Sequence, residues 1–99
     1  MPMIYVIQDP GNKNIAPARE FGELFVILKA RDVNDMEVMV NKLDNALRRI
    51  REEDWLLLIG DPVAIGVAVT LALKHNGGMV KILKWDRRHY KYEVKEIVI

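Results

Sequence analysis

The chain has 99 residues, of which 51% are hydrophobic and 29% are charged, and its net charge is +1; this is the composition of one small globular domain, so we expect residues 1–99 to form a single domain. The absence of cysteine excludes disulfides and thiolate metal sites and indicates a reducing cytoplasm. Serine is also absent and Thr70 is the only threonine, so a Ser, Cys or Thr nucleophile is not expected.

Two short apolar runs near the start of the chain predict two strands. Residues 3–7 (MIYVI) end at the Pro-Gly turn cluster in QDPGNKN, and residues 24–29 (LFVILK) follow a loop and one helical turn at REFGE. Because the second run is apolar on both faces, we expect it to lie in the centre of a sheet.

The clearest helix follows between residues 33 and 50. Its apolar residues recur at spacings of three and four, which places them on one stripe: Val33, Met36, Val40, Leu43, Leu47 and Ile50. Asn34, with Glu37 three residues later, resembles a capping box. The stripe is short for a two-stranded coiled coil, and we expect it to pack against a sheet.

A third, buried strand is predicted for residues 55–59, and it ends at the corner Gly60-Asp61-Pro62. In many α/β proteins such a corner holds a phosphate, but neither the Walker motif nor the dinucleotide-binding glycines are present. Asp61 is instead suited to cap the next helix, and Pro62 to occupy its first position. We therefore expect a helix cap here and not a phosphate site.

The helix after this corner, residues 63–73, is apolar on every side, which is typical of a helix that is buried on every side. Either the first helix covers its outer face or a second copy of the chain does, and we expect a homodimer or higher oligomer. The residues predicted for that interface are Val63, Val67, Thr70 and Leu71. The corner also interrupts the apolar run of residues 55–73, so we do not expect a membrane span.

Residues 79–85 and 90–99 flank the turn residues DRRH and predict an antiparallel hairpin. The elements then follow in the order β-β-α-β-α-β-β, and right-handed helical crossovers make the strands that they join parallel. The expected fold class is therefore α/β: a single-domain mixed five-stranded sheet with a parallel β-α-β-α-β centre and a C-terminal antiparallel hairpin.

The C-terminal hairpin is also the most basic part of the chain, and aromatic residues are interleaved with its lysines and arginines. Basic side chains neutralise phosphates and aromatic rings stack on exposed bases, so the hairpin is a candidate nucleic-acid contact. The alternative is a solvated edge hairpin whose charges discourage aggregation. The candidate nucleic-acid-binding residues are Lys84, Trp85, Arg87, Arg88, Tyr90 and Lys91.

Aspartates follow four of the predicted strands. If these strands are parallel, the aspartates lie at one edge of the sheet, where α/β proteins bind ligands. Carboxylates there could hold Mg²⁺ for phosphoryl transfer, with Arg87 or Arg88 as electrostatic partner, although aspartate is also common in turns and at helix caps. The candidate metal ligands are Asp9, Asp61 and Asp86, and Asp32 follows the second strand.

Residues 56–88 (LLLIGDPVAIGVAVTLALKHNGGMVKILKWDRR) resemble a family of small uncharacterised proteins of tailed bacteriophages and related viruses or mobile elements. The similar features are a strand ending in Gly-Asp-Pro, a small-residue helix, Gly-Gly and a strand ending in Trp-Asp-Arg-Arg. APAREFGELFVIL resembles the N-terminal half of that family. The resemblance implies a viral or mobile-element origin, and hence the cytoplasm of a host cell, but no catalytic residue.

These observations favour a binding protein over an enzyme, with no cofactor. The first hypothesis is a small accessory protein that contacts nucleic acid through the hairpin. The alternatives are a structural or protein-interaction module acting as a homo-oligomer, and an Mg-dependent phosphoryl-transfer enzyme that uses the strand-end aspartates. We expect neither a membrane nor a small molecule as partner. The absence of serine and cysteine and the single glutamine hint at a thermophilic host.

Overall fold

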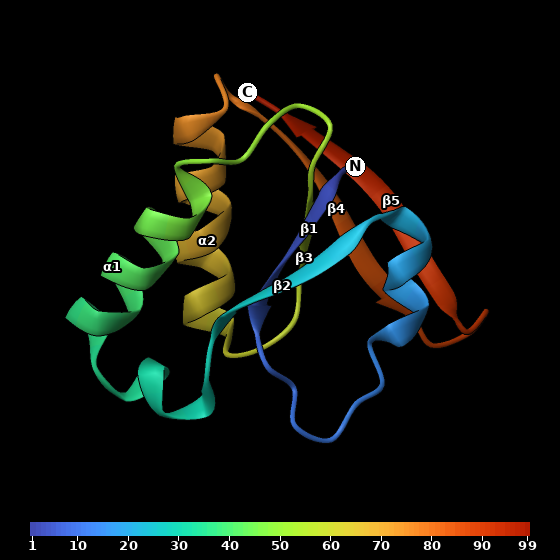
Figure 1. Cartoon of the computed structure of the whole chain (residues 1–99), viewed down its shortest axis with the longest axis horizontal. Helices are drawn as coiled ribbons and strands as arrows, with labels where there is room; N and C mark the ends of the chain where they lie inside the picture. Colours follow the sequence, from blue (N-terminus) through green and yellow to red (C-terminus); the bar gives the residue numbers. More distant parts are fainter.

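A five-stranded sheet of order β2-β1-β3-β4-β5 forms the centre of the molecule in the computed structural model, which describes residues 1–99 (Figure 1). The first four strands are parallel, and β5 pairs antiparallel with β4. The predicted α/β fold, with its parallel centre and C-terminal hairpin, is therefore confirmed. The strands are β1 (Met3–Gln8), β2 (Glu23–Leu28), β3 (Trp55–Leu57), β4 (Met79–Asp86) and β5 (Lys91–Val98).

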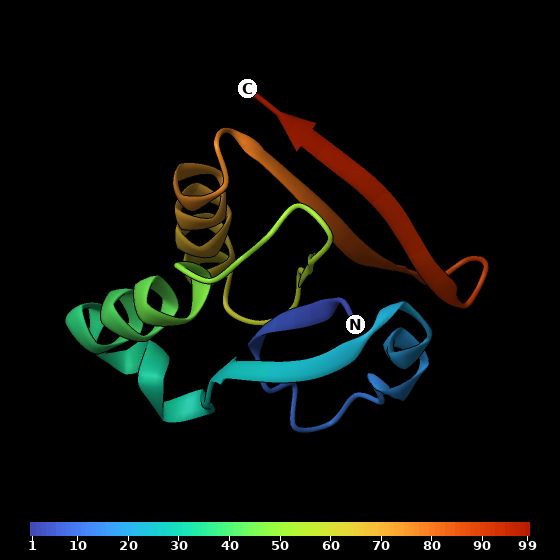
Figure 2. The ribbon, with the colours of Figure 1, turned by 45° about the horizontal axis from the view of Figure 1, so that its top comes forward.

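Helical segments cover both faces of this sheet. The helices α1 (Met36–Leu47) and α2 (Pro62–His75) lie on one face, and the short 3-10 helix η1 (Ala16–Phe21) lies on the other (Figure 2). A second 3-10 helix, η2 (Ala30–Asn34), leads into α1. The chain moves outward from β1 to β2 and then returns past β1 to β3. Right-handed crossovers in opposite directions require opposite faces, which explains the two layers.

The prediction that the second strand is central is wrong. β2 is an edge strand, bonded only to β1, and its Phe25 and Val26 side chains are 46% and 40% exposed. The strand beside it, β1, is interior, and its residues from Ile4 to Ile7 are all buried; β3 is the middle strand of the five. Apolarity on both faces of a strand is typical of central strands, but it does not establish which strands are neighbours.

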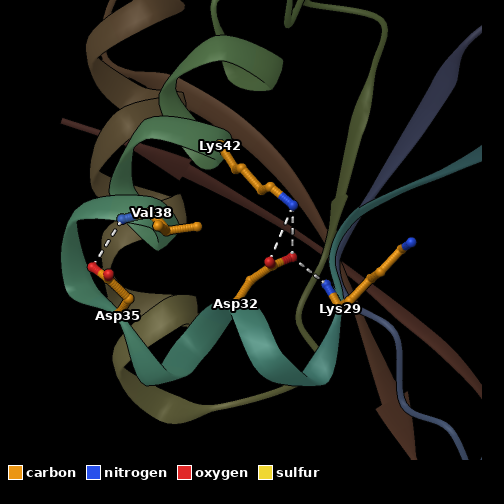
Figure 3. A network of polar contacts seen from close by, with 5 residues as sticks. All are labelled: Lys29, Asp32, Asp35, Val38 and Lys42. Carbon is orange, nitrogen blue, oxygen red and sulfur yellow. Dashed lines mark hydrogen bonds and ion pairs between the residues drawn. The ribbon is translucent and has the colours of Figure 1, made fainter.

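The register predicted for the first helix is also wrong in part. Asp35 caps α1, since its carboxylate accepts hydrogen bonds from the amide of Glu37 at 3.0 Å and from the amide of Val38 at 3.3 Å (Figure 3). The predicted cap, Asn34, is the last residue of η2 instead. The core side of α1 is formed by Met39, Leu43 and Leu47, whereas Met36 on the first turn is exposed. The extra 3-10 turn before the cap therefore shifts the start of the helix.

The predicted cap at the second corner is confirmed. One carboxylate oxygen of Asp61 accepts hydrogen bonds from the amides of Val63 and Ala64 at 2.9 and 3.2 Å, and Pro62 begins α2. The Asp61 amide in turn donates to the side-chain oxygen of Gln8 on β1, at 2.6 Å. The helix N-terminus is thus satisfied by a carboxylate from its own chain, which leaves no place there for an anion.

The apolar helix α2 is covered on two sides. Three alanines at spacings of four face the sheet, and α1 packs along a second side. Of the residues predicted for an oligomer interface, Val67 and Leu71 are half-buried within the monomer, while Val63 and Thr70 are exposed. The helix α1 therefore covers one side of α2, as one of the two alternatives from the sequence expected, and part of the outer side of α2 stays exposed. Neither α1 nor α2 combines the length and the apolarity that crossing a bilayer demands.

A polar contact joins the two helices beside this apolar interface. Asp44 on α1 lies 2.7 Å from Nε2 of His75 at the end of α2, and it also accepts from Arg48 at 2.7 Å. These hydrogen bonds, first from His75 and then from Arg48, lower the pKa of the Asp44 carboxyl from 3.8 to about 2. Folding therefore favours the ionised form of Asp44.

We expect this pair to make the protein less stable in acid. Because the pKa of Asp44 is lower in the folded chain, its contribution is complete above about pH 4 and is lost as the pH falls toward 2. Asp44→Asn should lower the free energy of unfolding at pH 7 and flatten its decline between pH 4 and 2, as measured by urea unfolding. Glu20→Gln, at an exposed side chain, is the control. Equal acid profiles for Asp44→Asn and the parent chain would contradict the prediction.

Candidate nucleic-acid interface

The carboxyl ends of the parallel strands β1, β3 and β4 meet at one edge of the sheet. The chain that leaves β1 continues to η1 on one face, whereas the chain that leaves β3 continues to α2 on the other (Figure 2). A divergence of this kind between neighbouring strands opens a crevice, and α/β proteins bind ligands in such crevices. A cleft of about 570 Å³ lies at this point, and we call it the carboxyl-edge cleft.

The lining of the carboxyl-edge cleft comes from four parts of the chain: the loop after β1, the end of β3, the end of β4 with the hairpin turn, and β5. The nine lining residues are Lys13, Asn14, Ile15, Leu58, Ile59, Lys84, Trp85, Arg87 and Tyr92. Three of them are cations and none is acidic. Because no ion pair involves any of the three cations, their charges are available to an anionic ligand.

Two aromatic rings form one wall of the cleft. Trp85 and Tyr92 are directly opposite each other across the β4–β5 ladder, and their rings meet edge to face with centroids 5.0 Å apart. Tyr92 is buried, and burial raises the pKa of its phenol, so it stays neutral. Trp85 is 37% exposed. The packed tyrosine therefore holds a tryptophan that is still accessible to a ligand.

The structure divides the six predicted nucleic-acid-binding residues into two groups. Lys84, Trp85 and Arg87 line the cleft. Lys84 is opposite Glu93 in the ladder, on the other face of the sheet from Trp85, so it borders the cleft at its rim. Three further predicted residues are exposed on or next to the hairpin turn, outside the cleft: Arg88, Tyr90 and Lys91.

Asp86 shapes the hairpin turn that presents these cations. One of its carboxylate oxygens accepts from the amides of Arg88 and His89, and the other lies 2.7 Å from Nδ1 of His89. These hydrogen bonds, led by that of the His89 ring, lower the pKa of Asp86. Tyr90 completes the turn with a positive φ of 50° and is 81% exposed. The turn is thus held by its own side chains and directs Arg87 toward the cleft.

Sequence reasoning missed the contribution of the loop after β1. Lys13 and Asn14 lie more than seventy positions from Arg87 in the chain, and they reach the cleft because β1 is the neighbour of β3. The sign that could have identified them is the turn cluster QDPGNKN, which follows a strand and carries a lysine. Placing that lysine required the strand order.

The four strand-end aspartates lie at the same edge but are used separately. Asp9 accepts from the amide of Gly11, Asp61 caps α2, and Asp86 holds the hairpin turn. The buried Asp32 accepts from the Lys29 amide at 2.8 Å and from the Lys42 ammonium at 3.1 Å; these bonds lower its pKa (Figure 3). No group of three or more His, Asp or Glu side chains is arranged to hold a metal ion, so the geometry gives the magnesium hypothesis no support.

The fold and the cleft together define a small doubly wound α/β protein with a basic, aromatic-lined cleft at the carboxyl edge of its sheet. The chain belongs to the phage Pam3 gp32-like protein family, whose model matches residues 2–99. This membership confirms the phage family that the motifs of residues 56–88 suggested. No curated protein and no solved structure matches the chain.

Proposed function

We propose that this phage-family protein binds single-stranded nucleic acid in the carboxyl-edge cleft. The observation that carries the proposal is the set of three unpaired cations, Lys13, Lys84 and Arg87, around a partly exposed tryptophan, with no acidic residue in the lining. Proteins that bind single strands combine a basic groove for the phosphates with aromatic rings on which bases stack. The volume of about 570 Å³ lies in the range of ligand sites.

Two of the other cations of the hairpin are engaged by side chains of the chain itself, whereas Arg88 and Lys91 are in no ion pair. Lys81, on the same hairpin, lies over the Trp55 ring at 4.3 Å from its centroid, and Lys95 pairs with Glu93 at 3.1 Å. The cations of the cleft have no such partner within the chain. Leaving them unpaired gives no gain in stability, whereas they would attract a phosphate backbone.

A single strand fits the cleft better than a duplex does. Trp85 lies inside the cleft and not on a protruding surface, so a base must leave a stacked helix to reach it. The exposed Tyr90 on the adjoining turn offers a second ring for a neighbouring base.

Binding can be measured by fluorescence anisotropy with a labelled thymine oligonucleotide at low salt. Nonspecific binding to nucleic acid has a Kd of about 10⁻⁴–10⁻⁶ M, and we expect the parent chain to fall in that range. Arg87→Glu should weaken binding by roughly tenfold or more and lower the salt dependence by about one phosphate contact. Trp85→Ala should cost about 1–3 kcal/mol of binding free energy through the loss of one stacking platform.

Lys74→Glu is the matched control, because it makes the same change in charge at an exposed position at the end of α2, outside the cleft. It should leave both the affinity and the salt dependence unchanged. If the parent chain fails to bind at about 100 µM, or if both reversals weaken binding equally, the cleft is not a nucleic-acid site.

A structural module that acts by self-association is the second candidate function. The observation in its favour is that large apolar side chains remain exposed on several elements, among them Val63 on α2 and Phe25 and Val26 on β2. Exposed apolar surface of this kind is typical of interaction sites. The two functions are independent, because the β2 edge does not contribute to the carboxyl-edge cleft.

A further inference from the structure

The two edges of the sheet differ in how they are protected. The β5 edge carries four charged residues among its eight, a pattern that discourages pairing with another strand. The β2 edge has the sequence ELFVIL, in which Glu23 at the first position is the only charge, and it contains neither proline nor lysine. A six-residue apolar edge strand without such protection is a site for pairing with a further strand.

The sheet beside β2 is also incompletely covered. A cleft of about 400 Å³ lies between α1 and the face of β1 and β2, and its lining includes Tyr5, Phe25 and Ile27. The Tyr5 and Phe25 rings meet edge to face with centroids 5.9 Å apart. On the opposite face of the strand Val26 is partly exposed. Apolar surface therefore remains open on both faces at this edge.

The backbone of β2 shows which groups are free. The Glu23 amide donates to the carbonyl of Pro2, so position 23 is bonded toward β1. Since backbone groups alternate along a strand, the amide and carbonyl groups of Leu24 and Val26 point to the open edge. The alternation ends at Leu28, whose carbonyl accepts from the Asp9 amide at 2.9 Å on the β1 side, so the free groups are those of Leu24 and Val26. Val26 lies midway between Glu23 and Lys29, so it is the natural centre of a symmetric pairing.

The charges at the two ends of β2 decide the direction of pairing. Glu23 and Lys29 are both exposed, and neither is in an ion pair within the chain. In Figure 3 the Lys29 ammonium points away from Asp32, which is held by Lys42. An antiparallel second strand centred on Val26 brings Glu23 of one copy opposite Lys29 of the other. A parallel copy would place like charges together.

We propose that the β2 edge is a two-fold interface with a second copy of this chain. The β2 strands pair antiparallel, and the two five-stranded sheets become one continuous sheet. The two clefts beside α1 meet at the axis, where each copy covers the exposed Phe25 of the other. The carboxyl-edge clefts lie toward β4 and β5 and stay open in this dimer.

The mass in solution tests the interface directly. Light scattering with size exclusion, from about 1 to about 300 µM, should show a species of twice the 11.4 kDa chain at the upper end. Val26→Lys places a charge on the open edge at a partly exposed position, and it should shift the chain to monomer while the circular dichroism spectrum is retained.

A charge exchange tests the register without relying on that variant. Glu23→Lys and Lys29→Glu each place like charges opposite one another twice across the axis, and each should weaken dimerisation by roughly 2- to 30-fold. The double variant Glu23→Lys/Lys29→Glu restores opposite charges and should restore the parent affinity. Rescue of this kind requires that the two side chains meet across the interface.

Val63→Lys, on the exposed side of α2, is the control for the other apolar surface and should leave the dimer intact. A chain that remains monomeric at about 300 µM overturns the proposal. It is also overturned if Val63→Lys dissociates the dimer while Val26→Lys does not, or if the double charge variant is weaker than both single ones.

Discussion

Gly60→Ala should destabilise the fold by about 2–6 kcal/mol, the sum of a backbone strain and an overpacking cost. Gly60 has a φ of +121°, a conformation that residues with a Cβ rarely adopt. A Cβ at this position would lie 2.4 Å from Cβ of Gln8 and 2.6 Å from its side-chain oxygen. Cβ of Gln8 is fixed to the interior strand β1, so it cannot move away without a shift of the backbone.

The same substitution would also disturb the start of α2. The side-chain oxygen of Gln8 accepts from the Asp61 amide, and Asp61 caps the helix. Displacing Gln8 therefore removes a hydrogen bond next to the cap. Urea unfolding followed by circular dichroism measures the loss as a lower midpoint with an unchanged slope.

Gly66→Ala is the matched control in the same segment. Gly66 lies inside α2, is exposed, and has no atom within 4 Å of the position that a Cβ would take. Alanine there should stabilise the helix by about 0.5–1 kcal/mol, because glycine is the poorer helix former. If both variants change the stability by the same amount, the close approach of Gly60 to Gln8 is not a constraint on the fold.

The alternation of apolar runs and turns was sufficient to predict the fold class, because the ends of the elements are set by local chemistry. The corner at Gly60 is an example. Local chemistry determines that Asp61 caps a helix and that Pro62 begins it, and both roles are visible in three adjacent residues. The position of β2 depends instead on which strands become neighbours. A continuous apolar run such as LFVIL is compatible with an edge strand and with an interior strand. The residues of β2 alone therefore could not show that it lies at the edge.

The sequence predicted the part of the candidate site whose residues are close together in the chain. Trp85 and Arg87 lie on one hairpin and were identified from their own surroundings. Lys13 joins them only because the crossover from β1 to η1 ends beside β3 and β4, which is a property of the strand order. For the metal hypothesis the strand order alone was not enough. The four aspartates do reach one edge of the sheet, but each accepts hydrogen bonds from groups close to it.

The apolar spacing and the structure place different methionines of α1 in the core, and substitutions can distinguish the two. The spacing of apolar residues placed Met36 in the core, whereas in the structure Met36 is 57% exposed and Met39 is 1% exposed. Met39→Ala should therefore lower the free energy of unfolding by about 2–5 kcal/mol, since it removes a buried side chain and leaves a cavity beneath the helix.

Met36→Ala is the paired variant, because it deletes the same atoms from the same helix. At an exposed position it should change the free energy of unfolding by less than about 0.5 kcal/mol. Both values come from urea unfolding at one pH. The reverse order, with the larger loss at Met36, would mean that α1 is rotated from the orientation described here. Leu43 and Leu47 would then also leave the core, because they share the buried side with Met39.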